Sequence, residues 1–311
     1  MGAVVAAMAA SHAFTVMEPE AWDQFREMNR QHYKRLYGVE PPVHPKIQGE
    51  TLENVKPRYE HVRQGLDFLR CHLRETQPDA LLLIGDDQNE NYSEQCLPQL
   101  AIYKGERVVT SRHEFKCHQA LSEALSEGML HAGFDVAVSR KFPDDRLLSH
   151  AHVHLLERLL PEGDIPVVLI FVESIHAPAV DPPRCYAFGQ ALRSVIESNR
   201  PAGERIAVCA SGGLSHFSAA FPYHAYSGPF HYGSISEEFD RQVLEMMTQG
   251  EGEALAASLS SSDLLAHGDI ELRSWLTVLG MMGKAKAEIL AYEPFYRAIM
   301  AMGVAYWPTE S

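Results

Sequence analysis

The sequence predicts an α/β fold with a central, mostly buried sheet, flanking helices and a helical C-terminal part. Wholly apolar segments at 80–85 and 166–172 are typical of strands that are buried on both faces. Such segments alternate with longer ones in which apolar residues recur every three or four positions, as in helices. No linker or internal repeat divides the 311 residues, so we expect a single domain over 1–311.

Local composition justifies each expected element in turn. Residues 1–10 are apolar but lack the basic start of a signal peptide, so they predict a buried strand. Trp22, Phe25 and Met28 begin a run of side chains at helical spacing. In chain order we expect strand 1–10, helix 18–37, helix 59–76, strand 80–85, a hairpin of 100–103 and 107–110, helix 113–131, strand 135–139, strand 166–172, helix 185–198 and strand 205–210. From residue 236 onward the pattern predicts almost only helix.

The composition limits the classes of partner. A net charge of −14 argues against binding to nucleic acid or to an anionic membrane, because both require a basic surface. A local arginine or lysine could still hold a small anionic substrate. No run approaches ~18 apolar residues, so no membrane span is expected. The five scattered cysteines form no CxxC pair, which predicts reduced thiols and a cytoplasmic protein.

Polar residues that follow apolar strands mark the candidate site. His12 follows the first strand, and His216 lies just past the strand at 205–210. Glu271 opens a later helical run. Because the chemistry of α/β proteins lies at the carboxyl ends of strands, these residues indicate a metal or acid–base site. Taken singly, His12 could be a core histidine, and Glu271 could be a carboxylate stabilised by the helix dipole.

Six segments match the pattern of a known family in the right order. They are Ser11-His12; Leu82-Leu-Leu-Ile-Gly-Asp-Asp-Gln88 with Pro98 and Ala101-Ile-Tyr103; Ser149-His-Ala-His-Val-His-Leu-Leu156; Gly212-Gly-Leu-Ser-His216; Ile235-Ser-Glu-Glu-Phe-Asp240; and Ile270-Glu-Leu-Arg-Ser-Trp275. The chain therefore resembles the class III extradiol ring-cleavage dioxygenases, the family of the catalytic subunit of protocatechuate 4,5-dioxygenase. The resemblance covers most of the chain and is strongest from about 165 to 275.

The resemblance implies a non-haem Fe(II) site held by two histidines and one glutamate, with open positions for a catechol and O2. It assigns His12 and Glu271 as ligands, but the second histidine position holds Gln88. Gln88 could ligate weakly, Asp86 could replace it, or iron could be bound only weakly while Gln88 contacts a substrate. We expect His12 and Glu271 to lie within ~10 Å of each other, with residue 88 beside them.

The resemblance also implies an acid–base histidine before the strand at 166–172. The best register selects His150, and we interpret His152 and His154 as part of a solvated helix start. His216 would contact the substrate or support the groups that do. The segment 221–232 is longer than the family pattern; it could cover the active site or form a surface or subunit contact.

Three functions remain open from the sequence. The first is an extradiol dioxygenase that opens a catecholic, and possibly carboxylated, aromatic with O2. The second is a metal-dependent hydrolase or lyase on the same scaffold. The third is a non-catalytic relative that binds a small molecule or a partner subunit. Retention of His12, His150, His216 and Glu271 argues against the third function, whereas Gln88 favours the second or third. We also expect a homo-oligomer.

Overall fold

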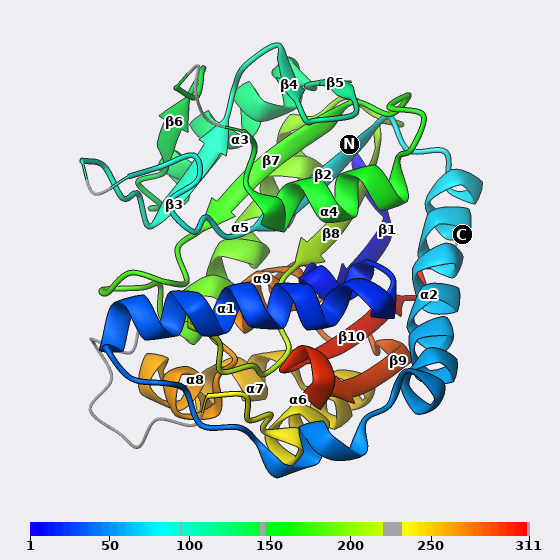
Figure 1. Cartoon of the computed structure of the whole chain (residues 1–311). Coiled ribbons are helices and arrows are strands. Elements are labelled where there is room, and N and C mark those ends of the chain that lie inside the picture. The colour runs from blue at the N-terminus through cyan, green and yellow to red at the C-terminus, as the bar shows by residue number, and fades with distance from the viewer. Residues whose placement is uncertain (94, 144–146, 220–231, 310–311) are drawn as a thin grey trace.

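A mixed eight-stranded sheet forms the centre of the molecule, in the order β6-β3-β7-β2-β8-β1-β10-β9 (Figure 1). The computed structural model describes residues 1–93, 95–143, 147–219 and 232–309. Four central strands run parallel: β7 (Val167–Val172), β2 (Ala80–Gly85), β8 (Arg205–Ser211) and β1 (Ala3–Ala10). Their apolar sequences fit this position, because helices cover both faces of a parallel sheet.

Shorter or later strands extend the sheet on both sides. On one side, β3 (Leu100–Tyr103) runs antiparallel to β7, and β6 (Ala137–Ser139) pairs with β3 in parallel. On the other side, β10 (Met300–Trp307) runs antiparallel to β1 and pairs with β9 (Glu288–Phe295). The first strand therefore lies between β8 and β10, inside the sheet.

Helices cover both faces of the sheet. Alternate residues of β1 point to opposite sides, so that Ala7 and Ala9 join one core and Ala6 and Met8 the other. The first core includes residues of α3 (Gln119–His131), α5 (Pro182–Asn199) and α9 (Leu272–Met282), and the second includes residues of α2 (Leu52–Glu75) and α4 (His150–Leu159). The remaining helices are α1 (Trp22–Tyr37), α6 (Glu237–Gln249), α7 (Gly252–Ser258), α8 (Ser261–His267) and the short 3₁₀ turns Phe14–Val16, Pro19–Ala21, Pro45–Gly49 and Tyr296–Ala298.

The α/β class predicted from the sequence is confirmed, but the prediction of a helical C-terminal part is wrong after Met282. Helices α6 to α9 occupy 237–282, and the chain then forms β9 and β10. Alanine and methionine, which are frequent in β10, favour helix in isolation. Pairing with β1 overrides that preference, because β1 would otherwise expose an unpaired edge.

The predicted hairpin of 100–103 with 107–110 is also wrong. The buried strand β3 pairs with β7 and β6 in the main sheet. The half-exposed strand β4 (Arg107–Val109) pairs instead with β5 (Glu114–Lys116), which takes up the start of the helix predicted from 113. The helix α3 then begins after His118, whose side chain accepts a hydrogen bond from the backbone of Leu121.

Two further expectations concern surfaces. None of the helices in the described part of the chain combines the length and the apolar character needed to cross a bilayer. The segment that could cover the active site falls almost wholly within 220–231 and lies outside the described residues.

Candidate metal and acid–base site

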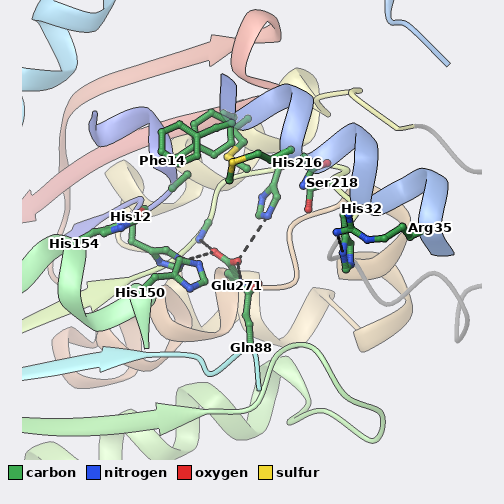
Figure 2. Close-up of a pocket in the computed structure, with 17 residues that line it drawn as sticks. His12, Phe14, His32, Arg35, Gln88, His150, His154, His216, Ser218 and Glu271 are labelled. Carbon is green, nitrogen blue, oxygen red and sulfur yellow. Dashed lines mark hydrogen bonds and ion pairs between the residues drawn. The ribbon is translucent and has the colours of Figure 1, made fainter. Parts of the chain in front are cut away.

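The residues predicted from the sequence meet at the carboxyl ends of the parallel strands. His12 follows β1, Asp86 and Gln88 follow β2, and His216 follows β8. Glu271 directly precedes α9 and points into the same space (Figure 2). The Nε2 atom of His12 lies 3.7 Å from Oε2 of Glu271. The predicted convergence of His12, Glu271 and residue 88 is therefore met, whereas their chemical roles stay predictions.

Three buried side chains form a cluster with the geometry of a metal site. One ligand atom each of His12, Asp86 and Glu271 lies within 4.8 Å of the others. Among the described residues, Nδ1 of His12 and Oδ1 of Asp86 have no hydrogen-bond partner although both are buried. Buried polar atoms normally have partners, and a cation held by the cluster would supply one for a carboxylate oxygen such as Oδ1 of Asp86.

The electrostatics of the cluster favour a bound cation. Burial raises the pKa of Asp86 well above its usual value, and the charge of Glu271 raises it further. Burial lowers the pKa of His12 well below its usual value, and the neighbouring His150 adds to this effect. A divalent cation would stabilise the ionised carboxylate and the neutral imidazole, which are the forms that bind metals.

Gln88 lies between the two carboxylates of the cluster. Its Nε2 donates hydrogen bonds to Oε1 of Glu271 at 3.1 Å and to Oδ2 of Asp86 at 3.4 Å. The amide therefore bridges two groups that would otherwise repel each other. With respect to the alternatives left open by the sequence, Asp86 lies among the residues that could hold a metal, and Gln88 hydrogen-bonds to two of them.

His150 is held in the pocket by a carboxylate that the sequence did not identify. Glu90 Oε2 lies 2.7 Å from Nδ1 of His150 and also accepts from its backbone N–H at 3.1 Å. Burial alone would lower the pKa of His150, but the hydrogen bond and charge of Glu90 outweigh it and raise the pKa. With Nδ1 occupied, Nε2 is the atom left for proton exchange with a ligand.

The prediction that His152 and His154 belong to a solvated helix start is wrong. His152 is completely buried, packs 4.3 Å from the ring of Phe171 and makes a 3.0 Å hydrogen bond with the carbonyl of Ile170. Burial lowers the pKa of His152 to about 4. His154 lines the pocket, and its Nδ1 donates to the carbonyl of His12 at 2.5 Å. The first turn of α4 packs inward because β2 and β7 lie beneath it.

The glycine turn after β8 fixes Glu271 and His216. The backbone N–H of Gly213 donates to Oε2 of Glu271 at 3.1 Å. A Cβ atom at Gly212 would lie 2.9 Å from the carbonyl oxygen of Glu271, so only glycine allows this close approach. Nδ1 of His216 lies 2.9 Å from the carbonyl of Leu214, which leaves Nε2 of His216 directed towards Glu271 at 3.7 Å.

A buried carboxylate supports this turn from behind. Asp240 accepts hydrogen bonds from the backbone and the hydroxyl of Ser215 at 3.1 and 2.8 Å, and from the hydroxyl of Tyr292 at 2.7 Å. The segment 235–240, which matches the family pattern in the sequence, therefore contacts the turn that carries His216. Neither Glu90 nor Asp240 could be assigned a role from sequence, because only the folded chain brings them to their partners.

A cavity of about 440 Å³ opens over the cluster, a volume typical of small-molecule pockets. His12, Gln88, His150, His216 and Glu271 all line it. The opposite wall comes from the 3₁₀ turn at Phe14 and from one side of α1, which Figure 2 shows beside the cluster. Sequence reasoning identified α1 as a helix but missed its part in the pocket.

Comparison with known proteins gives matches of three kinds. Residues 40–306 match the family described as the catalytic LigB subunit of aromatic ring-opening dioxygenase. The chain is 25% identical to a 2,3-dihydroxyphenylpropionate/2,3-dihydroxicinnamic acid 1,2-dioxygenase of Rhodococcus globerulus, over 60% of this chain and 54% of that protein. It is 27% identical to a gallate dioxygenase of Pseudomonas putida, over 60% of this chain and 52% of that protein. The matched region thus spans about half the length of these relatives.

A solved structure is similar in fold. It is the crystal structure of an uncharacterized protein, JW3007, from Escherichia coli K12, with a TM-score of 0.52 and 15% sequence identity. The superposition covers 79% of this chain and 91% of that chain. At this identity the likeness supports the fold alone.

Proposed function

Since the chain belongs to the family of the catalytic LigB subunit of aromatic ring-opening dioxygenases, we propose that it is an extradiol-type dioxygenase. It would open a catecholic ring with O2, breaking the carbon–carbon bond beside one hydroxyl-bearing carbon and placing both oxygen atoms in the product. The observation that carries the proposal is the buried cluster of His12, Asp86 and Glu271, which faces a pocket that His150 and His216 also line.

His12, Asp86 and Glu271 would hold the metal, for which we propose Fe(II). Bound Fe(II) would supply the redox chemistry that lets a catechol react with O2. Gln88 would hold the two carboxylates apart through its two hydrogen bonds and stand at the edge of the ligand set. These residues lie under the pocket, so a ring placed there would meet the metal through its hydroxyl oxygens.

His150 is the proposed acid–base. Its Nδ1 is occupied by Glu90, so its Nε2 would accept a proton from a catechol hydroxyl and return it as the ring opens. His216 has the complementary arrangement: if Nδ1 donates to the carbonyl of Leu214, Nε2 is an acceptor for a substrate hydroxyl. The apolar side chains Phe14, Phe25 and Met28 would pack on the ring and exclude water.

A second function is favoured by one specific observation. Asp86 and Glu271 together give the cluster two carboxylates, and carboxylate-rich sites also suit harder cations. A hydrolase or lyase that uses another divalent metal is therefore the alternative. The location of the protein in the cytoplasm is a proposal that follows from its cysteine usage.

The test is metal analysis of anaerobically purified protein combined with O2 uptake on a panel of catechols. The panel includes 2,3-dihydroxyphenylpropionate and gallate, the compounds in the names of the two relatives. Iron-dependent O2 consumption, with one O2 consumed per ring opened, is the expected result. Binding of a divalent metal without O2 consumption on any catechol would overturn the dioxygenase proposal in favour of the alternative.

A further inference from the structure

One side of α1 lines the pocket over most of its length. Phe25, Met28, Asn29, His32 and Arg35 all contribute to the wall, and they recur at the three- and four-residue steps that define one helix face. From Phe25 to Arg35 the helix rises about 15 Å. The pocket is therefore elongated along the helix axis, and it extends well beyond the space that a single six-membered ring fills.

The chemistry of this wall changes along the helix. At its start, Phe25 stacks on Phe14 with ring centroids 5.3 Å apart, and Met28 continues the apolar surface. At its end, the guanidinium of Arg35 lies 3.3 Å from Nδ1 of His32. Figure 2 shows these two basic side chains together, on the side of Glu271 that faces away from His154.

Arg35 differs from the other basic residues of α1 in its partners. Each of the other arginine and lysine side chains of α1 forms an ion pair: Arg26 with Asp23, Arg30 with Glu27 and Lys34 with Glu40. Within the described part of the chain, Arg35 hydrogen-bonds only with His32 and forms no ion pair with a carboxylate. An arginine that lines a cavity and lacks a carboxylate is suited to bind one from a ligand, through two parallel hydrogen bonds.

The pocket lining does not share the negative charge of the whole chain, because the single arginine among its described residues balances their single carboxylate. The net charge of the protein is −14, yet Glu271 is the sole carboxylate among the described residues that line this cavity. The cluster at Glu271 is where the catechol hydroxyls would bind. A second anionic group would therefore meet favourable charge only at the Arg35 end.

We propose that Arg35, with His32 beside it, binds a carboxylate at the end of a side chain on the aromatic ring. The substrate class is then a catechol with a carboxylate-terminated substituent, rather than one with the carboxylate directly on the ring. This inference rests on the proposed function for the position of the ring. It adds the residue that selects the substrate, which is a specificity role separate from the ring-opening chemistry.

The test measures binding without turnover. Metal-loaded protein is titrated in a calorimeter, in the absence of O2, with 2,3-dihydroxyphenylpropionate and with its methyl ester, which is larger by one methyl group and carries no charge. We expect the acid to bind about 10- to 100-fold more tightly than the ester, as befits a charge-assisted pair of hydrogen bonds. In Arg35→Met this preference should vanish while the affinity for the ester is unchanged.

Two controls distinguish a specific role of Arg35 from a general effect of removing a positive charge. Lys34→Met removes the same charge from the next position of α1, which does not line the pocket, and should keep the preference for the acid. Gallate, with its carboxylate on the ring, should lose less affinity than 2,3-dihydroxyphenylpropionate in Arg35→Met. Equal binding of acid and ester by the unaltered protein, or equal losses in Arg35→Met and Lys34→Met, would overturn the proposal.

The outcome also distinguishes failure of the inference from failure of the proposed function. A preference for the acid that depends on Arg35, without ring cleavage in air, would retain the anion site and reject the dioxygenase. Ring cleavage of acid and ester with equal kcat/KM, in the unaltered protein and in Arg35→Met, would retain the dioxygenase and reject the anion site.

Discussion

Asp86 and Gln88 lie two residues apart on the segment after β2. Asp86 lies in the cluster with His12 and Glu271, and Gln88 hydrogen-bonds to Asp86 and Glu271. Asp86 offers a buried oxygen without a partner among the described residues, whereas Gln88 already donates two hydrogen bonds. This difference supports Asp86, and not Gln88, as the proposed ligand. The two hydrogen bonds of Gln88 also indicate that a histidine at position 88 would reach the same cluster.

Substitutions at these two positions should change metal binding in opposite directions. Asp86→Asn removes a charged ligand and should lower the metal retained after reconstitution and desalting by about tenfold. Gln88→His adds an imidazole, a better donor for Fe(II) than an amide oxygen, and should raise the retained iron. Metal content per chain, measured by mass spectrometry, checks both. Loss of a native activity in Gln88→His with unchanged metal content would instead show a role for Gln88 towards the substrate.

Glu90 should matter through His150. Glu90→Gln keeps the shape of the side chain but removes the charge that holds Nδ1 of His150. If His150 is the acid–base, kcat should fall roughly tenfold or more, with little change in KM or metal content. Glu75→Gln, at the exposed end of α2, is the matched control. An unaltered kcat in Glu90→Gln would remove Glu90 from the mechanism.

At the scale of elements, the sequence predicted the strands whose own residues are apolar enough to require burial on both faces. The largely apolar strands β2, β7 and β8 were predicted to within one residue of their ends, because burial on both faces leaves a clear signal. The strand β10 was missed, because its alanines and methionines become a strand only when β1 lies beside them. The predicted hairpin was wrong for a similar reason, because β3 pairs with β7 and β6 in the main sheet and not with β4.

The residues of the candidate site also fall into two groups, those that the sequence could predict and those that it could not. His12, His216 and Glu271 could be predicted, since each lies next to the end of a strand or helix, at the rim of the sheet. The contributions of Glu90, Asp240 and α1 could not, because they depend on contacts between segments far apart in the sequence. The inward position of His152 likewise depends on the packing of α4 against β2 and β7.

Asp240 of α6, which contacts the glycine turn after β8, should make the stability of the protein depend on pH. Burial raises the pKa of Asp240 to about 6, although hydrogen bonds from Tyr292 and Ser215 oppose this. Its folded pKa thus exceeds the unfolded value of about 3.8, so its contribution to stability is complete below about pH 4 and is lost as the pH rises through 6.

Asp240→Asn lacks this proton and should lack its pH dependence. The free energy of unfolding of the unaltered protein, relative to Asp240→Asn, should decrease by up to about 3 kcal/mol between pH 4 and pH 7. Urea unfolding at several pH values measures the difference, in which the contributions of all other groups cancel. A difference that stays constant across this range would contradict the raised pKa.

At the scale of the whole molecule, one sheet joins the two ends of the chain. Strands from residues 3–10, 205–211 and 300–307 lie side by side, and each face of the sheet has its own continuous core. The single domain and the homo-oligomer expected from the sequence remain predictions. The first of them has a direct test.

We expect one cooperative unfolding transition. Trp22 lies in one core and Trp275 and Trp307 in the other, so tryptophan fluorescence reports on both faces of the sheet. Its thermal transition should coincide with the loss of helix measured by circular dichroism, as for a two-state protein. Two separated transitions, or a proteolytic cut near residue 160 that leaves two folded fragments, would show two domains instead.

The position of β1 has a consequence for the order of events during synthesis on the ribosome. His12 leaves the exit tunnel well before the strands that lie on either side of β1, because β8 and β10 come much later in the sequence. The apolar nascent β1 must therefore wait until β8 and β10 have both been made before it has both of its neighbours. The cluster of His12, Asp86 and Glu271 can form only after Glu271 has been made, so binding of the proposed metal would follow the translation of that residue.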